Sequence, residues 1–245
     1  MKTGYSALLA IIPVLFLSAT TFAQLPEGAK QIVVVTTEDW EAPQGTAQRF
    51  ERHGKKFKKV GPAFDVVVGK TGLAWGKGIG PADLSTAHGP TKKEGDGKSP
   101  AGIFLLPEAF GYAPKPLSQS RLPYFPITRI SECVDDSHSS QYNELLDNNK
   151  GAKDWSSSET MLRDDGLYRW GVFVAHNANP PRPGAGSCIF LHIWQGPGVG
   201  TEGCTAMRET DIEVLLRWLD PAEEPLLVQL PAGEYAKVRG KWRLP

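Results

Sequence analysis

Short apolar runs, separated by polar or glycine-containing turns, dominate the chain after residue 30, and this pattern predicts strands rather than long helices. At one point His53 and Gly54 separate two such runs, as a hairpin turn would. A terminal hairpin is predicted from Tyr235–Val238 and Lys241–Arg243, with Gly240 at its turn. The other predicted strands span Ile32–Thr36, Thr46–Arg52, Lys55–Val60, Phe64–Val68, Gly102–Leu106, Tyr168–His176, Ser187–Trp194 and Pro225–Leu230.

Helical spacing is confined to a few short segments. Apolar side chains within Ile212–Leu219 form one stripe behind a capping box at Thr210–Glu213, which predicts a helix that Pro221 ends. A second capping box, Ser156–Glu159, predicts a short helix, and Ser140–Asn149 is a third helical candidate. The chain shows no internal repeat and no break in composition. We therefore expect a mainly β protein with peripheral helices.

The first 23 residues have the pattern of a cleavable export signal. One basic residue, Lys2, precedes an apolar run over Ala7–Leu17, and Thr21-Phe22-Ala23 supplies small residues at an A-x-A-like cleavage site. The run is shorter than the ~20 residues that a membrane-spanning helix needs, so stable membrane insertion is not expected. The expected organisation is a signal peptide, a short linker and one domain, over residues 1–23, 24–30 and 31–245.

Charge and residue usage exclude several classes of function. The 27 basic and 27 acidic residues balance, and basic and aromatic residues are not interleaved, so nucleic acid is not an expected partner. The polar, glycine-rich segment Ser85–Pro100 lacks the spacing of a phosphate cradle. It is either a solvated loop or a loop that lines a substrate groove. Histidines, cysteines and acids lack the paired spacing of zinc sites, so neither a metal nor a cofactor is predicted.

The chain contains three cysteines, Cys133, Cys188 and Cys204. An odd number leaves at least one thiol unpaired within the chain, and in an oxidising compartment the remaining two can form a disulfide. Cys133 and Cys188 are the obvious pair if Cys204 stays reduced, and three free thiols are the alternative. The unpaired thiol is a candidate nucleophile.

The segment around His192 and Cys204 carries the candidate chemistry. Alternation in the predicted strand puts Ile189, Leu191 and Ile193 toward the core, and Cys188, Phe190, His192 and Trp194 on the opposite face, as in a cleft wall. The glycine-rich loop Gln195–Glu202 can fold Cys204 back against this strand. A thiol beside an imidazole and near a helix start has a lowered pKa, which makes it a nucleophile toward carbonyls. The amides of Gly203 and Cys204 are candidate oxyanion donors. The alternative is a packed strand histidine and an inert thiol.

These residues resemble the YkuD-type L,D-transpeptidases, whose pattern is a strand histidine, a variable loop and then Ser/Thr-His-Gly-Cys. Here His192 is followed by Thr201-Glu202-Gly203-Cys204. Upstream, Lys93–Phe104 is similar to the family's Thr/Ser-Pro-x-Gly-x-Phe segment, and Gly69–Trp75 resembles the strand and turn before it. The likeness covers roughly Val66 to Asp220 and fits an exported, Gram-negative branch. It implies the β-sandwich-like catalytic fold of that family.

The resemblance implies a role for each matching residue. Cys204 would be the nucleophile that takes the acyl group of a peptidoglycan tetrapeptide stem and releases its terminal D-alanine. His192 would act as general base and then as acid, and Gly203 would supply an oxyanion amide. An amine acceptor makes the reaction a transpeptidation, whereas water makes it hydrolysis by an L,D-carboxypeptidase or amidase. We further expect Trp194, Thr201 and Glu202 to bind substrate.

The same resemblance implies covalent reaction of Cys204 with carbapenem-type β-lactams. The export signal predicts a periplasmic location, and we expect a monomeric protein. One departure is Glu202, which stands where the family has histidine. If Glu202 lies near the thiol, its charge raises the pKa of Cys204 and slows acylation. If it points away, it supports the loop by hydrogen bonding. A peptidoglycan-binding module with little turnover is the alternative that this departure leaves open.

The remaining histidines are predicted to have no catalytic role. His176 ends a predicted strand and is expected to be packed or hydrogen-bonded, whereas His88 and His138 lie in polar segments and are expected to be solvated. Asp135 and Asp136 are more readily explained as residues of a turn than as a cation site.

Overall fold

The computed structural model describes residues 25–79, 88–112, 120–148 and 153–245. The expected signal peptide lies outside these ranges. Residues 25–30, the described part of the expected linker, pack against the domain, since Leu25 and Ala29 are buried in the main core. The Leu25 N–H donates to the Trp242 carbonyl oxygen at 3.2 Å, which ties this segment to the C-terminal end of the domain.

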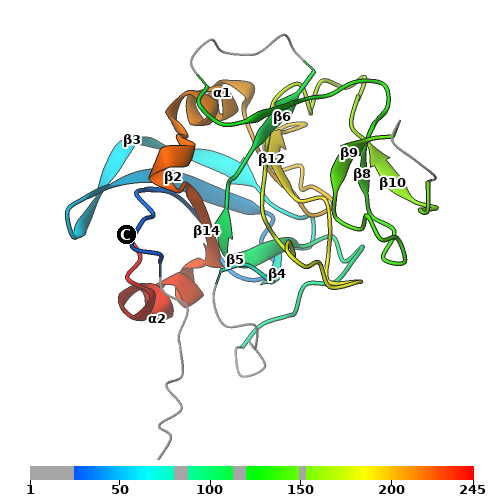
Figure 1. Ribbon diagram of the computed structural model, residues 1–245. Helices are drawn as coiled ribbons and strands as arrows, with labels where there is room; N and C mark the ends of the chain where they lie inside the picture. The colour runs from blue at the N-terminus through cyan, green and yellow to red at the C-terminus, as the bar shows by residue number, and fades with distance from the viewer. Residues whose placement is uncertain (1–24, 80–87, 113–119, 149–152) are drawn as a thin grey trace, which may run out of the picture.

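Within the described ranges, eleven strands form one sheet in the order β4-β5-β14-β1-β2-β3-β13-β12-β11-β6-β7 (Figure 1). Among the predicted strands, Ile32–Thr36, Thr46–Arg52 and Pro225–Leu230 correspond to the neighbouring strands β1, β2 and β14. The predicted hairpin around His53 and Gly54 joins β2 to β3. The two apolar runs on either side of Gly61 are one continuous strand, β3, rather than two. The strands span β1 Gln31–Thr37, β2 Gln44–His53, β3 Lys56–Val67, β4 Leu73–Trp75, β5 Ser99–Leu105, β6 Ala109–Gly111, β7 Tyr124–Pro126, β11 Gly171–Phe173, β12 Phe190–Ile193, β13 Thr205–Met207 and β14 Leu226–Pro231.

A second, three-stranded sheet has the order β10-β8-β9, with β8 Ser131–Val134, β9 Leu145–Asp147 and β10 Ser158–Thr160. It lies beside β12, on the side away from the β2–β3 hairpin in Figure 1. Both helices predicted in this part of the chain are wrong. Ser156 does not cap a helix, because its N–H and hydroxyl donate to Asp136 at 2.8 and 2.7 Å. Pairing with β8 instead makes Leu145–Asp147 and Ser158–Thr160 strands, which shows tertiary contacts overriding a local capping signal.

The helix predicted from the stripe before Pro221 is present as α1, Glu209–Trp218, followed by the short 3-10 helix η1, Pro221–Glu223. The predicted capping box does not form, since Arg208 is the N-cap and no side chain caps the helix. The predicted terminal hairpin is wrong, because Ala232–Trp242 is helix α2. Within the described part of the chain, no helix is both long and apolar enough to cross a membrane.

The core is divided by β12. The main cluster lies between the large sheet and the two helices, and it includes the aliphatic side chains Leu191 and Ile189. A second cluster lies between β12 and the small sheet, and its members are Phe110, Ile127, Cys133, Met161, Tyr168, Cys188, Phe190 and Cys204. The predicted mainly β fold with peripheral helices is confirmed. Its organisation also places the only free cysteine inside the smaller, more aromatic cluster.

Candidate active site

Two neighbouring parallel strands bring Cys204 and His192 to the same part of the large sheet. Strand β12 pairs with β13, and His192 is opposite Ala206, two residues after Cys204. In β12 Phe190 packs in the second cluster while Leu191 packs in the main core, so the predicted alternation of faces is correct there. His192 is not on an open cleft wall, however. It is buried, with an exposed fraction of 6%.

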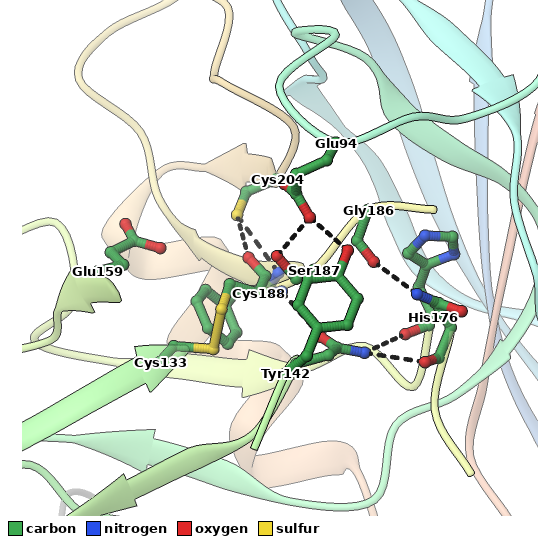
Figure 2. The surroundings of a disulfide bond; sticks show 12 residues. Glu94, Cys133, Tyr142, Glu159, His176, Gly186, Ser187, Cys188 and Cys204 are labelled. Carbon is green, nitrogen blue, oxygen red and sulfur yellow. Dashed lines mark hydrogen bonds between the residues drawn. A yellow bond between two sulfur atoms is a disulfide. The ribbon is translucent and has the colours of Figure 1, made fainter. Parts of the chain in front are cut away.

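The sulfur of Cys204 lies against the beginning of β12 (Figure 2). The Phe190 N–H donates to Cys204 Sγ at 3.3 Å, and Sγ lies 3.5 Å from the carbonyl oxygen of Cys188. Cys188 itself forms a disulfide with Cys133 in β8, which is the pairing proposed from the sequence. The disulfide thus connects the small sheet to the backbone that holds the sulfur of Cys204.

Burial determines the protonation states of both candidate catalytic groups. It raises the pKa of Cys204 to about 12, and the nearby charge of Glu159 adds to this shift. It lowers the pKa of His192 to about 4. The expected lowering of the thiol pKa is therefore wrong. Cys204 is separated from α1 by β13, so the helix start does not reach the sulfur, and desolvation outweighs the nearby hydrogen-bond donors.

The orientation of His192 leaves one ring nitrogen available as a base. Its Nδ1 lies 2.8 Å from the carbonyl oxygen of Ile193, and because a carbonyl can only accept, Nδ1 carries the proton. Nε2 then holds a lone pair. A neutral imidazole with a lone pair on Nε2 has the protonation state that a general base requires, and both residues are neutral at rest.

Cys204 and His192 both line a cavity of about 580 Å³. Part of the segment predicted as either a solvated or a groove-lining loop contributes to this wall, namely Lys92, Glu94 and Gly95. Lys92 is buried, and its ammonium donates to Asp96 at 2.6 Å. The described residues of the loop therefore favour the groove-lining interpretation, while residues 85–87 lie outside the described ranges.

The residues predicted to bind substrate are placed differently from one another. Thr201 and Glu202 line the cavity, but Trp194 is not part of its wall in the described structure. Thr201 shapes the turn before the nucleophile, since its hydroxyl donates to the Cys204 carbonyl oxygen at 2.6 Å and accepts the Gly203 N–H at 3.2 Å. The Gly203 amide is thus occupied in the resting structure, and it must exchange this partner to bind an oxyanion.

Glu202 does not act on the thiol in the way that its place in the motif suggested. Its carboxylate forms a salt bridge with Lys70 at 2.7 Å, and its side chain is 83% exposed. The acid whose charge raises the pKa of Cys204 is instead Glu159. This pairing is what the second interpretation drawn from the sequence, support of the loop, expects.

Two residues near the sulfur were missed by the sequence analysis. Glu159 was assigned to a helical capping box, and Tyr168 to a strand without a further role. Both line the cavity, and the Tyr168 hydroxyl donates to Glu159. Pairing of β10 with β8 places Glu159 opposite Cys133, and this long-range register has no local signature in the sequence.

Comparison with known proteins places the chain in a family of catalytic domains. Residues 53–228 match the model of the L,D-transpeptidase catalytic domain known as YkuD. The chain belongs to this family. Among solved structures it is similar to Bdellovibrio bacteriovorus Bd1075, with 16% sequence identity and a TM-score of 0.41. That alignment covers 90% of this chain and 57% of the Bd1075 chain. The curated proteins contain no match.

Proposed function

We propose that this protein is an exported L,D-transpeptidase that transfers the acyl group of a peptidoglycan stem peptide through a thioester on Cys204. The observation that carries the proposal is the placement of Cys204 and His192 on adjacent strands, in the wall of one cavity, with His192 Nε2 free to accept a proton. Membership of the YkuD family supplies the substrate class. Neither a metal nor a cofactor is needed for this chemistry.

The proposed reaction begins with a neutral thiol and a neutral imidazole. The thiol proton moves to His192 Nε2 while Sγ attacks the carbonyl carbon that precedes the terminal D-alanine. The C–N bond then breaks, and the imidazolium gives its proton to the departing amine, which leaves the thioester and a neutral histidine. An acceptor amine attacks the thioester in turn, its proton passes to His192, and the thiol is restored. Transfer in this order never requires a free thiolate in the resting enzyme.

The disulfide supports an exported location. Disulfides form and persist in oxidising compartments and are rare where thiols are kept reduced. The Cys133–Cys188 bond, combined with the export signal read from the first 23 residues, fits a protein that works in the periplasm. Burial of Cys204 inside the second cluster is consistent with a thiol that stays free while the other two cysteines pair.

The proposal is tested by incubating the purified protein with disaccharide-tetrapeptides and analysing the products by mass spectrometry. We expect loss of the terminal D-alanine together with a cross-linked dimer, and neither product from a Cys204→Ala variant. Shortened monomers without dimers would assign the protein to hydrolysis instead. If folded protein with a free Cys204 gives neither product, the proposed function is wrong.

A second measurement separates an enzyme from a peptidoglycan-binding module. Intact mass after exposure to a carbapenem-type β-lactam should show one covalent adduct on the wild type and none on Cys204→Ala. A module that binds sacculi without turnover would show no adduct on either protein.

A further inference from the structure

The position of Cys204 raises the question of what stabilises its sulfur when the thiolate forms. The residue is buried, and in the resting structure the Phe190 N–H donates to Sγ at 3.3 Å. Burial disfavours the charged form strongly, as the raised pKa of the thiol shows. A thiolate in such a place is stabilised by each additional hydrogen-bond donor that can turn toward it.

Tyr168 lies beside both reacting groups. Its ring meets the His192 ring edge-on, with centroids 5.0 Å apart, and it packs in the same buried cluster and lines the same cavity as Cys204. Edge contacts with Phe110 at 5.8 Å and Phe190 at 5.6 Å fix the buried ring. The ring is therefore held in place, while the hydroxyl proton can still rotate about the C–O bond.

Glu159 competes with the sulfur for that proton. Its carboxylate accepts the Tyr168 hydroxyl in the resting structure, and β10 holds the residue opposite Cys133 in β8. The other charged groups that act on Glu159 are Arg163, whose Nη1 lies 3.9 Å away, and Asp135. Burial is the main reason that the pKa of Glu159 is raised. This carboxyl can consequently carry a proton more readily than an exposed glutamate.

We propose that Tyr168 is a further catalytic residue, whose hydroxyl turns from Glu159 to Cys204 Sγ as the thiolate forms, and that Glu159 is a positioning residue that controls this turn. The inference rests on the proposed function and deepens it. No covalent bond to the hydroxyl proton breaks. The thiol proton goes to His192 Nε2, and the Tyr168 O–H exchanges one acceptor, the carboxylate, for another, the sulfur. When the thioester collapses and the thiol returns, the hydroxyl turns back. A protonated Glu159 favours the active arrangement, because it can donate to the tyrosine oxygen.

A second tyrosine–glutamate pair in the same region provides a matched control. The Tyr142 hydroxyl donates to Glu94 Oε2, which also accepts the Ser187 hydroxyl at 2.7 Å. Tyr142 is as buried as Tyr168, and Glu94 lines the same cavity. Figure 2 shows Glu94 and Glu159 on different sides of Cys204. Removing the Tyr142 hydroxyl tests the cost of breaking such a pair without removing a donor to the sulfur.

The experiment measures the pH dependence of Cys204 alkylation by iodoacetamide, followed by intact mass, together with the rate of acylation by a carbapenem. Tyr168→Phe should move the alkylation midpoint upward by about 1–2 pH units and slow acylation roughly 10- to 100-fold, the range for a hydrogen bond to a charged group. Tyr142→Phe should leave both quantities at their wild-type values. Glu159→Gln should move the midpoint downward, because it removes a negative charge and replaces the charged acceptor of the Tyr168 hydroxyl with a weaker, neutral one.

A double variant identifies the route by which Glu159 acts. In the Tyr168→Phe background, Glu159→Gln should shift the midpoint less than in the wild type, since only its charge effect remains. Equal shifts in the two backgrounds would overturn the positioning role of Glu159. Unchanged midpoint and rate in Tyr168→Phe, or equal losses in Tyr168→Phe and Tyr142→Phe, would overturn the role of Tyr168.

The alkylation assay keeps this inference separate from the proposed function. Iodoacetamide needs no peptidoglycan substrate, so the role of Tyr168 toward the sulfur can be measured even if tetrapeptides are not turned over. If Tyr168→Phe does not fold, Glu159→Gln preserves side-chain volume and supplies the test, and a midpoint that fails to fall would overturn the inference.

Discussion

His176 and His192 have similarly lowered pKa values, but the groups around the two rings differ. Both rings are buried, and burial lowers the pKa of each to about 4. His192 uses Nδ1 to donate to a backbone carbonyl and shares a cavity with Cys204. His176 instead donates through Nε2 to the Ala185 carbonyl oxygen at 3.0 Å, and its ring meets Phe104 edge-on. The shifted pKa therefore reports burial, and only the neighbouring nucleophile distinguishes the candidate base.

Of the two histidines, His192 should be the one whose replacement has the larger effect. In His192→Ala we expect acylation of Cys204 by a carbapenem to slow by roughly 10²–10⁴-fold, the usual contribution of a general base. The melting temperature should change little, because the ring borders a cavity. Single-turnover rates by intact mass, combined with thermal unfolding, check this. A large fall in melting temperature with an unchanged rate per folded molecule would make His192 a structural residue and remove the comparison.

Replacing His176 should affect the pH dependence of stability instead. The folded-state pKa of His176 lies below its ordinary value of 6.5, so the unfolded chain binds a proton that the folded chain does not. Its contribution to stability is present above pH 6.5 and is lost as the pH falls toward 4. His176→Phe should therefore lose about 2 kcal/mol less stability than the wild type between pH 7 and pH 4.5.

Urea unfolding at the two pH values measures this difference. His88, whose side chain is exposed, provides the control, and His88→Asn should keep the wild-type dependence on pH. If His176→Phe loses as much stability on acidification as the wild type does, the buried ring does not contribute to the acid sensitivity of the fold.

The smallest effect is expected at Glu202. Restoring the family residue with Glu202→His should leave the alkylation midpoint of Cys204 nearly unchanged, because the exposed carboxylate is already paired with Lys70. The same pH profile of iodoacetamide labelling used for Tyr168 measures it. A clear shift to lower pH would show that the charge of Glu202 reaches the thiol, and would give that residue the role now assigned to Glu159.

The sequence was most informative where a local pattern matches a local structure. Alternation in β12 predicted the two faces of the strand that carries His192, and the apolar stripe predicted α1. The error at α2 was avoidable. Tyr235, Val238 and Trp242 are spaced as neighbours on one helix face, but Gly240 was interpreted as a hairpin turn, whereas it lies within the helix.

Other features of the site had no local signal. Glu159 reaches the cavity only because β10 pairs with β8, and the burial that raises the pKa of Cys204 comes from side chains far apart in the sequence. Pairing registers and desolvation are properties of the assembled tertiary structure. The motif was therefore enough to select Cys204 and His192 as candidate residues, whereas their protonation states could not be predicted from it.

The Cys133–Cys188 bond also has an entropic consequence for the site. It joins residues separated by 55 positions. In the chain-entropy description, closing a loop of that length lowers the conformational entropy of the unfolded chain and so raises its free energy by about 4 kcal/mol at room temperature. In the folded protein the same bond restrains the small sheet, which otherwise relies on three short strands to stay docked beside β12. Formation of this disulfide therefore reduces the conformational freedom of the small sheet, whose strand β10 carries Glu159. The crosslink thereby raises the effective concentration of the Glu159 carboxyl near Tyr168.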